Sequence, residues 1–262
     1  MGYFGAALSD AGTSKRTNQD AVLLKIVRRP RDGAEHALVA VCDGMGGLAN
    51  GELAATTAIR AIESWFEEVF LPAAEAYGES DFIDDWQRLT VAINQAIMRY
   101  GRERGIELGT TLTLILLLGG RYMLTHVGDS RVYAIDDTGD IEQLTEDHTL
   151  VAREIKRGNL TPEQAAIDAR RNVLLQCVGA SQKVIPQFRF GEISPGSVIM
   201  VCSDGLRHKN GEADFREHLR PAHNHSAADL EDRLRYLIDR AKDLRERDNI
   251  SAAAVKYTAE EA

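Results

Sequence analysis

Four short apolar runs follow one another between residues 111 and 144, and they constrain the fold more than any other feature of the sequence. The runs cover residues 111–118, 121–127, 130–135 and 140–144. Only two to four residues, rich in Gly and Asp, separate each run from the next. Connections this short join antiparallel strands, because a parallel pair needs a crossover of about a dozen residues or more. We therefore predict a four-stranded antiparallel meander.

The rest of the chain alternates between strand-like and helix-like patterns. Runs rich in Val, Leu, Ile and Phe predict strands near residues 3–10, 20–28, 36–42, 172–177, 185–191, 197–203 and 250–257. Apolar residues at three- and four-residue spacing predict helices from Asn50, from about residue 82, and near 147–156, 211–219 and 226–244. Mostly antiparallel strands interleaved with helix pairs predict an α+β layered sandwich.

Composition limits the kind of partner and compartment. The 262 residues carry a formal net charge of −9, which argues against nucleic acid or an anionic membrane as the main partner. No repeat or Pro/Gly/Ser-rich linker divides the chain, so we expect a single domain over residues 1–262. No stretch resembles a membrane span or a secretory signal, and the three cysteines form no Cys-x-x-Cys pair. We expect a cytoplasmic protein.

Two apolar strands end on the same pair of residues. "ALVAVCDG" ends at Asp43 and Gly44, and "SVIMVCSDG" reaches Asp204. Further acids at the edges of apolar runs are Asp20, Asp129 and Asp248. Each acid could be an ordinary turn residue, since Asp-Gly is common in turns. The alternative is that the acids converge, in which case an all-oxygen cluster selects hard ions such as Mg²⁺ or Mn²⁺. Small residues that would permit close approach are Gly44, Gly46 and Gly47.

The same acids fall inside a longer series of motifs. In chain order these are "RTNQDAV", "VCDGMGG" with "GELAA", "GTTLTLIL", "LTHVGDSRVYAI", "LTEDHTLV", "VIMVCSDGL" and "RDNISAAAV". The series resembles the metal-dependent protein phosphatases, the protein phosphatase 2C-like family, in its bacterial serine/threonine form. One such motif is weak, whereas the whole set in this order is specific. The resemblance implies a four-layer α-β-β-α sandwich, with two central antiparallel sheets flanked by helix pairs.

The resemblance also implies an activity and its ions. Family members hydrolyse phosphoserine and phosphothreonine in proteins by attack of a water that bridges two Mn²⁺ or Mg²⁺ ions. By this resemblance Asp43 bridges both ions and Gly44 gives its carbonyl to one of them. Asp204 and Asp248 would ligate the other ion.

Other motif residues would support these ligands. Asp20 matches the acid that holds ion-bound waters, and Asp129 matches one that binds a weaker third ion together with Asp204. Asn249 is expected to orient Asp248. Two threonines that we expect in the core beside the site are Thr110 and Thr111.

The residue that binds phosphate departs from the family pattern. Relatives place an Arg five residues before the motif Asp, whereas this chain has Lys15 there and Arg16 one residue later. Lys15 would act as a point charge and Arg16 as a bidentate fork, so the two are not equivalent. Both remain candidates for a catalytic role beside Asp43, and we favour Arg16 as the phosphate contact.

The motifs assign no general acid. Met45 stands where animal relatives often carry a His with that role, and Met cannot donate a proton. The leaving group must then be protonated by ion-bound water or by another residue. His126 is one candidate, but its alternation along the strand favours a packed histidine. Gln19 stands where some relatives carry a Glu. Because a neutral amide binds a metal ion more weakly than a carboxylate does, we do not count Gln19 among the metal ligands.

Residues 157–171 are polar and charged and show no strand pattern. They fall where the family carries a variable flap beside the active site, so we expect substrate choice to lie there; a solvated loop is the alternative. The resemblance implies phosphorylated proteins as partners, including a partner serine/threonine kinase or its substrates, and a monomer. The alternative function is a catalytically silent relative that binds phosphoproteins or regulates a kinase, although such relatives usually lose a metal acid.

Overall fold

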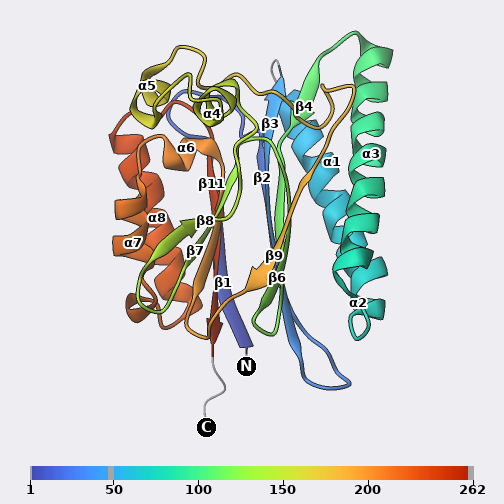
Figure 1. Ribbon diagram of the computed structural model, residues 1–262, viewed down its shortest axis with the longest axis vertical. Helices are drawn as coiled ribbons and strands as arrows, with labels where there is room; N and C mark the ends of the chain where they lie inside the picture. Colours follow the sequence, from blue (N-terminus) through green and yellow to red (C-terminus); the bar gives the residue numbers. More distant parts are fainter. Residues whose placement is uncertain (1, 47–49, 259–262) are drawn as a thin grey trace.

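The computed structural model describes residues 2–46 and 50–258. Two antiparallel sheets lie face to face, and helices cover the outer face of each sheet (Figure 1). The layers therefore run helix, sheet, sheet, helix, which confirms the predicted four-layer α+β sandwich. This arrangement suits the sequence, because each apolar sheet buries one face against the other sheet and one against helices.

The first sheet has the strand order β2-β3-β5-β6-β9, with β4 paired to the end of β3. Its strands are β2 (Asp20–Arg28), β3 (Glu35–Gly46), β4 (Leu108–Thr110), β5 (Leu112–Leu118), β6 (Arg121–Val127) and β9 (Gln187–Glu192). Every residue of β5 is buried, because this central strand is covered on both faces.

The second sheet has the strand order β1-β11-β10-β7-β8. Its strands are β1 (Gly2–Asp10), β7 (Arg131–Ile135), β8 (Ile141–Gln143), β10 (Val198–Cys202) and β11 (Ile250–Thr258). β1 and β11 pair along their whole length, so the beginning and the end of the described chain lie side by side.

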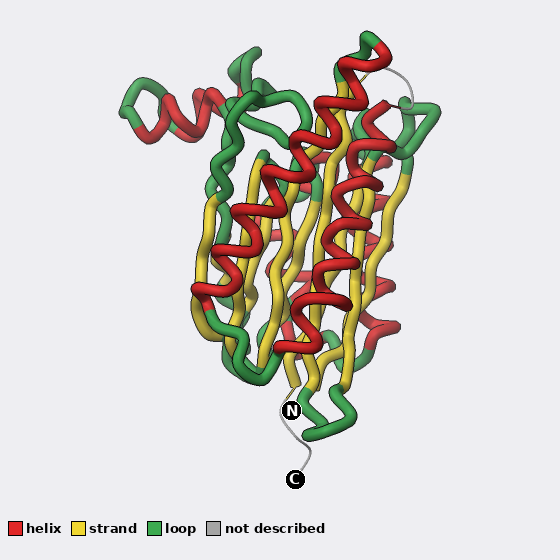
Figure 2. The backbone as a smooth tube through the Cα atoms, turned by 90° about the vertical axis from the view of Figure 1, so that its right-hand side faces the viewer, coloured by secondary structure: helices red, strands yellow, loops and turns green. Residues whose placement is uncertain are grey.

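Two long helices, α1 (Asn50–Trp65) and α3 (Glu79–Arg104), lie across the first sheet (Figure 2). Between them stand the π-helix η1 (Phe66–Phe70) and α2 (Leu71–Ala73). The second sheet is covered by α7 (Glu212–Leu219), the 3₁₀ turn η2 (Pro221–His223) and α8 (Ala227–Asp243). Short helices at the upper end of the sheets in Figure 1 are α4 (Leu150–Lys156), α5 (Pro162–Ile167) and α6 (Asp204–Arg207). None of the helices in the described residues has the length and apolarity to cross a bilayer.

Alternation along β3 divides the apolar interior into layers. Val39 packs between the two sheets, together with Ile115 and Ile199. Leu38 and Cys42 face the opposite way, into the layer beneath α1 and α3. The thiol of Cys42 therefore points into the core, although the residue precedes Asp43 directly in the chain.

The predicted meander is wrong at its centre. β5 pairs with β6 and β7 pairs with β8, but β6 and β7 belong to different sheets. The chain crosses at Gly128, whose φ of +117° is a conformation that side chains other than glycine rarely adopt. His148 fixes the crossing, because its N–H donates to the Gly128 carbonyl (2.7 Å) and its ring Nδ1 accepts the Gly128 N–H (3.1 Å). The crossing places Asp129 at the seam between the sheets.

The strand predicted at residues 172–177 is also wrong. In the described chain this segment makes only an isolated bridge, between Leu174 and Thr149, and the next residue, Val178, bridges to Thr110. The apolar pattern here reflects burial of side chains rather than hydrogen bonding within a sheet, since Cys177 and Val178 are both buried.

Candidate metal centre

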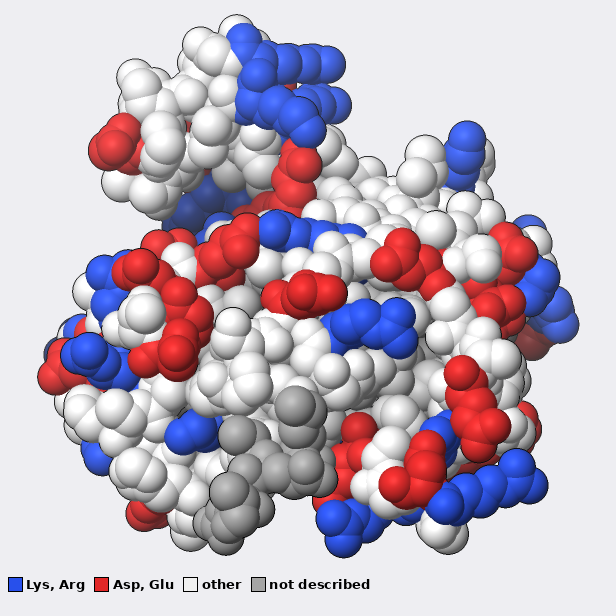
Figure 3. All heavy atoms as spheres, turned by 60° about the horizontal axis from the view of Figure 1, so that its bottom comes forward, with Lys and Arg blue, Asp and Glu red and all other residues white. Residues whose placement is uncertain are grey.

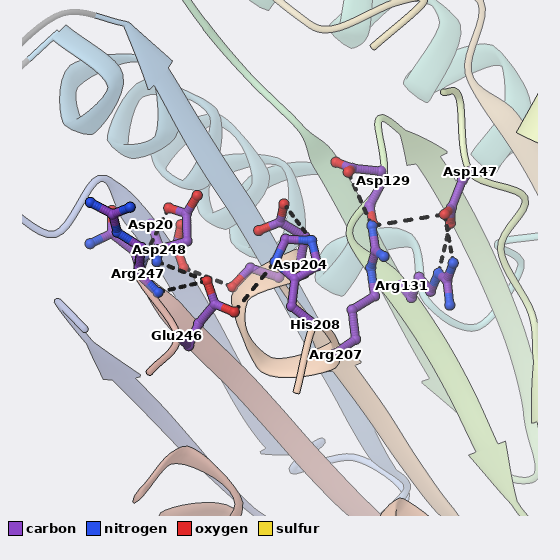
Figure 4. Close-up of polar contacts among 12 residues, drawn as sticks. Asp20, Asp129, Arg131, Asp147, Asp204, Arg207, His208, Glu246, Arg247 and Asp248 are labelled. Atoms are coloured by element: carbon purple, nitrogen blue, oxygen red, sulfur yellow. Dashed lines mark hydrogen bonds and ion pairs between the residues drawn. The ribbon is translucent and has the colours of Figure 1, made fainter. Parts of the chain in front are cut away.

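The five acids of the motifs lie together at one edge of the two sheets. Asp20 begins β2 and is the direct partner of Asp43 in β3, so the first sheet sets two carboxylates side by side. From the second sheet come Asp204, which follows β10, and Asp248, which precedes β11. Asp129 lies on the crossing between β6 and β7. Figure 4 shows Asp20, Asp248, Asp204 and Asp129 along one row.

Asp43 is at the centre of this cluster. Burial, followed by repulsion from Asp20, Asp204, Asp129 and Asp248, raises the pKa of Asp43 well above its usual range. A single carboxylate is therefore affected by the charges of the other four, which requires these side chains to lie near one another. Turn or cap residues have no need of this arrangement, since gathered like charges destabilise a fold unless cations balance them.

The neighbouring acids show the same effect. Burial and the charges of Asp248 and Asp20 raise the pKa of Asp204 to about 6, against an opposing effect of Arg207. Burial and the charge of Asp204 raise the pKa of Asp129 to about 6 as well. The cluster thus holds protons more tightly than isolated carboxylates do, as expected for a site built to bind cations.

The main chain at Asp43 is held by two buried threonines. The Asp43 N–H donates to Thr111 Oγ1 (2.8 Å), and Thr110 Oγ1 donates to the Asp43 carbonyl (3.0 Å). Their predicted place in the core beside the site is confirmed. At Gly44 a Cβ would lie 2.2 Å from the Gly51 carbonyl oxygen, so only glycine fits. Gly47 lies outside the described residues.

Unpartnered oxygens show that the cluster suits a hard cation. Oδ1 of Asp20 and Oδ1 of Asp204 are buried, and neither finds a hydrogen-bond donor within the described chain. Such oxygens are costly to bury without a partner, and all-oxygen donors fit Mn²⁺ or Mg²⁺. Across residues 2–46 and 50–258, no three Asp, Glu, His or Cys side chains converge closely enough to hold one ion as they stand. Cationic side chains of the protein lie among the acids instead.

Lys15 is one of these cations. Its Nζ forms an ion pair with Asp248. Burial by itself lowers the pKa of Lys15, but the bond to Asp248 and the charges of Asp43 and Asp20 raise it above its ordinary value. Arg16 is exposed, and its side chain has no polar partner in the part of the chain that is described. The structure thus brings Lys15 to the carboxylates and leaves the favoured Arg16 outside.

Asn249 connects the loop of Lys15 to Asp248. Its backbone N–H donates to Asp248 Oδ1 (2.8 Å), which orients this carboxylate as predicted. Its side-chain oxygen accepts the Gln19 N–H (3.0 Å). The side-chain amide nitrogen donates to two carbonyls, those of Ala11 and Thr17. One buried side chain therefore sets the shape of the loop before β2.

His126 is a packed histidine, as its alternation predicts. The ring is fully buried and its Nδ1 lies 2.8 Å from Thr113 Oγ1. Burial and the charge of His148 lower the pKa of His126 to about 3, so the ring is neutral at neutral pH and has no extra proton to give. Gln19 is buried and its amide donates to the Gly46 carbonyl (3.2 Å), in keeping with its exclusion from the ligands.

No motif marks the second cation of the cluster, Arg207. Its Nη2 lies 3.1 Å from both Oδ2 and the carbonyl oxygen of Asp129, and 3.8 Å from Asp147 Oδ2. Asp147 in turn accepts two bonds from Arg131, of 2.8 and 2.7 Å (Figure 4). Arg131 and Asp147 lie inside the quoted motifs, whereas Arg207 lies one residue beyond the motif that ends at Leu206.

His208 and Glu246 form a brace that the motifs also leave unmarked. The ring of His208 lies between Asp204 (Nε2 to Oδ2, 3.4 Å) and Glu246 (Nδ1 to Oε2, 3.6 Å). Glu246 Oε1 accepts the N–H groups of Arg247 (2.8 Å) and Asp248 (3.0 Å). These contacts fix the loop that carries Asp248 relative to the helix that carries Asp204.

Comparisons with known proteins agree with this geometry. The family model of protein phosphatase 2C matches residues 11–239. The serine/threonine phosphatase stp of Listeria monocytogenes is 31% identical over 224 residues, which cover 84% of each chain. The crystal structure of the Mycobacterium tuberculosis serine/threonine phosphatase PstP/Ppp superposes with a TM-score of 0.83 at 29% identity, covering 99% of this chain and 100% of that one.

A further solved structure carries the ions themselves. The catalytic domain of serine/threonine protein phosphatase PstP in complex with two manganese ions superposes with a TM-score of 0.79 at 28% identity, covering 98% of this chain and 99% of that one. The predicted dependence on Mn²⁺ or Mg²⁺ agrees with this finding. The chain therefore belongs to the protein phosphatase 2C family, the metal-dependent serine/threonine protein phosphatases of bacterial type that its motifs predict.

Proposed function

We propose that this chain removes phosphate from phosphoserine and phosphothreonine of proteins at the five-acid cluster. The observation that carries the proposal is Asp43, a buried carboxylate with four further carboxylates near enough to raise its pKa. Bound cations would offset the repulsion between these carboxylates. They would also attract a negatively charged phosphate ester to the site. The relatives, which are themselves serine/threonine phosphatases, support the same reaction.

The chain's contribution is to hold oxygen donors in place. Those that would bind a pair of Mn²⁺ or Mg²⁺ ions are Asp43, the carbonyl of Gly44, Asp204 and Asp248. When bound, the ions would supply an activated water as nucleophile and would neutralise the phosphate. Thr111 fixes the main chain at Asp43, and Asn249 fixes the carboxylate of Asp248.

Two further residues act on water and on phosphate in this proposal. Asp20 accepts a hydrogen bond from Ser203 Oγ (2.8 Å), which leaves its other oxygen free to orient a water beside Asp43. Lys15 is the phosphate contact, because its ammonium group already lies among the carboxylates. Since Met45 has no proton to give, the leaving group takes its proton from water.

A third ion at Asp129 has a competitor within the chain. The guanidinium of Arg207 already lies 3.1 Å from Asp129 Oδ2, at a side chain that is 9% exposed. An ion there would have to displace this cation or share Asp129 with it. We therefore propose that the enzyme works with two ions and binds a third only weakly.

The setting of the reaction is likewise a proposal. The substrates are phosphorylated proteins, among them a partner serine/threonine kinase or its own substrates, and the protein acts in the cytoplasm as a monomer. Residues 1–262 would act as a single catalytic domain, with the flap at about 157–171. The net charge of −9 supports protein rather than nucleic-acid partners.

Hydrolysis of p-nitrophenyl phosphate with and without Mn²⁺ tests the proposal. Asp43→Asn and Asp204→Asn should each lower Mn²⁺-dependent turnover by about 100-fold or more. Asp84→Asn, which changes an exposed acid on α3, is the matched control and should retain activity. Phosphothreonine peptides should then be hydrolysed in preference to phosphotyrosine peptides. A wild-type protein without Mn²⁺-dependent turnover would point instead to a silent phosphoprotein-binding relative.

A further inference from the structure

A cleft of about 1210 Å³ opens beside the acidic cluster. It reaches Asp248 and Lys15 at the cluster, and its walls come from two separate parts of the chain. One wall is the segment that holds α4 and α5, which Figure 3 shows as a lobe standing off the body above a hollow. The other wall is the loop after α8 together with the end of α6.

Each acid that lines this cleft has an ion-pair or hydrogen-bond partner within the protein. Glu146 pairs with Lys156, and Asp147 pairs with Arg131. Glu246 accepts two backbone N–H groups, and Asp248 pairs with Lys15. Three of these four carboxylates are therefore balanced by a Lys or Arg side chain of the protein, and the exception is Glu246.

A set of cations in the same lining has no such partner. In the described residues, no ion pair or side-chain hydrogen bond is formed by Arg171, Lys209, Arg245 and Arg247. All four are exposed. The cleft consequently presents surplus positive charge on a chain whose net charge is −9. Charge of this kind attracts an anionic ligand into the cleft.

The backbone conformation of Arg245 supports a role for its side chain in contacting a ligand. Among the described residues, Arg245 is the only one other than glycine with a positive φ, at +62°. It ends α8 in a turn where the N–H of Arg245 bonds to the Lys242 carbonyl and the N–H of Glu246 to the Ala241 carbonyl, both 2.9 Å. Glycine is the usual residue at this position of a helix end, and the left-handed conformation costs other residues about 1–2 kcal/mol. A strained residue with an unpaired charge at a cleft is typical of a ligand contact.

The wall formed by α4 and α5 is apolar, and it therefore favours a peptide over a small anion as the ligand. Lining residues from the α4–α5 lobe include Val151, Ile155, Ala166 and Ile167. Ile167 is 84% exposed, an unusual position for a large apolar side chain. A peptide can offer acids to one wall and an apolar side chain to the other, whereas inorganic phosphate has no apolar part to pack against the second wall.

We propose that this cleft selects phosphopeptides with Asp or Glu close to the phosphorylated residue, and that Arg245 is a specificity-determining residue. The proposal rests on the phosphatase function proposed above and names its substrate class. The acids of the peptide would pair with Arg245 and its cationic neighbours, while the phosphorylated residue lies at the acidic cluster.

Matched phosphothreonine peptides test this, one with Glu on both sides of the phosphothreonine and one with Gln. Wild type should show a kcat/KM about tenfold higher for the Glu peptide, the factor that a charge-assisted contact carries. The preference should shrink between about 50 mM and about 500 mM NaCl, because exposed charges are screened by salt. Arg245→Gly should lose most of the preference and hydrolyse p-nitrophenyl phosphate at the wild-type rate.

Thermal stability measurements distinguish a loss of peptide selectivity from damage to the fold. Arg245→Gly relieves the left-handed strain, so its thermal midpoint should equal or exceed that of wild type while its selectivity falls. Arg216→Ala, which removes an unpaired exposed charge from α7, is the control and should keep both the preference and the stability. Equal kcat/KM for the two peptides in wild type, or an unchanged preference in Arg245→Gly, would overturn the proposal.

A binding measurement keeps the two proposals distinguishable. Fluorescence anisotropy of the labelled Glu and Gln peptides needs no turnover, and the Glu peptide should bind more tightly to wild type than to Arg245→Gly. Absence of p-nitrophenyl phosphate hydrolysis together with this binding difference would reject the phosphatase function alone. Hydrolysis without any difference in binding or in kcat/KM would reject the acidic substrate class alone.

Discussion

The ammonium group of Lys15 forms an ion pair with Asp248, a carboxylate 233 positions away in the sequence that the motifs assign to metal binding. The protein therefore places a cation of its own within a cluster of acids that repel one another. In the proposed enzyme, a divalent ion would compete with Lys15 for the same carboxylate. Metal affinity should then depend on a residue that is not itself a ligand.

Replacing Lys15 tests this competition. Lys15→Met makes the cluster more negative and removes the competitor, so Mn²⁺ should bind about 3- to 10-fold more tightly in calorimetric titration. The KM for p-nitrophenyl phosphate should rise, because the phosphate contact is lost. Arg16→Met removes a charge one residue away and should leave both quantities unchanged. A higher KM in Arg16→Met alone would assign the phosphate contact to Arg16.

The metal-free protein should lose stability as the pH rises from about 4 to about 7. Burial and neighbouring charges raise the pKa of Asp204 and Asp129 to about 6, whereas both groups titrate near 3.9 in an unfolded chain, as ordinary Asp does. The folded state therefore binds more protons than the unfolded state in this window, and its free energy of unfolding falls as protons leave.

Thermal unfolding in EDTA measures this effect. The midpoint should be about 5 °C lower at pH 7 than at pH 5, and saturating Mn²⁺ should reverse the trend by binding the ionised carboxylates. Asp204→Asn should flatten the dependence in EDTA. A midpoint that rises with pH in EDTA would contradict the prediction.

Gly44 should tolerate no side chain. In Gly44→Ala the added Cβ would lie 2.2 Å from the Gly51 carbonyl oxygen, so the main chain must move and urea unfolding should show a loss of about 2–3 kcal/mol. Weaker Mn²⁺ binding should accompany this, since the Gly44 carbonyl is a proposed ligand. In the control Gly78→Ala the Cβ meets only Asp81 Oδ2 at 3.7 Å, and the loss should stay below about 1 kcal/mol. Equal losses would show that the close approach is unimportant.

Arg207 should set the number of ions that bind. Arg207→Met frees the buried Asp129 carboxylate, so calorimetry should detect a third Mn²⁺ site that is weaker or absent in wild type. The same change leaves a buried charge unpaired and should lower the metal-free stability by about 3 kcal/mol. Arg235→Met removes the exposed pair with Glu231 and serves as the control, with little effect on either quantity. An unchanged ion count in Arg207→Met would show that Arg207 does not compete at Asp129.

Much of the site was predictable because apolar strands place its acids, within β3 for Asp43 and next to strand ends for the other sheet acids. Asp43 and Asp204 each follow a continuous apolar run, and such runs can be read from composition and length alone. The pairing of Asp20 with Asp43 follows once β2 and β3 are adjacent antiparallel strands. The alternation that buries Cys42 also follows from the period of a strand.

Other features depend on the path of the chain and on side-chain orientations, which no local sequence pattern encodes. The choice between Lys15 and Arg16 depends on the loop shape that Asn249 imposes from the far end of the chain. The crossing at Gly128 looks like a hairpin turn in sequence, because a two-residue Gly-Asp link serves either geometry. Arg207 points to Asp129 only because α6 is a short helix that turns its side chain toward the seam.

The ligands of the proposed metal centre come from opposite sides of the interface between the sheets, with Asp20 and Asp43 on one sheet and Asp204 and Asp248 beside strands of the other. Ions held there would link the two sheets across that interface. Any slip of one sheet along the other separates the donors, so catalytic competence would disappear long before the secondary structure does. Loading with manganese consequently reports on the alignment of the entire sandwich.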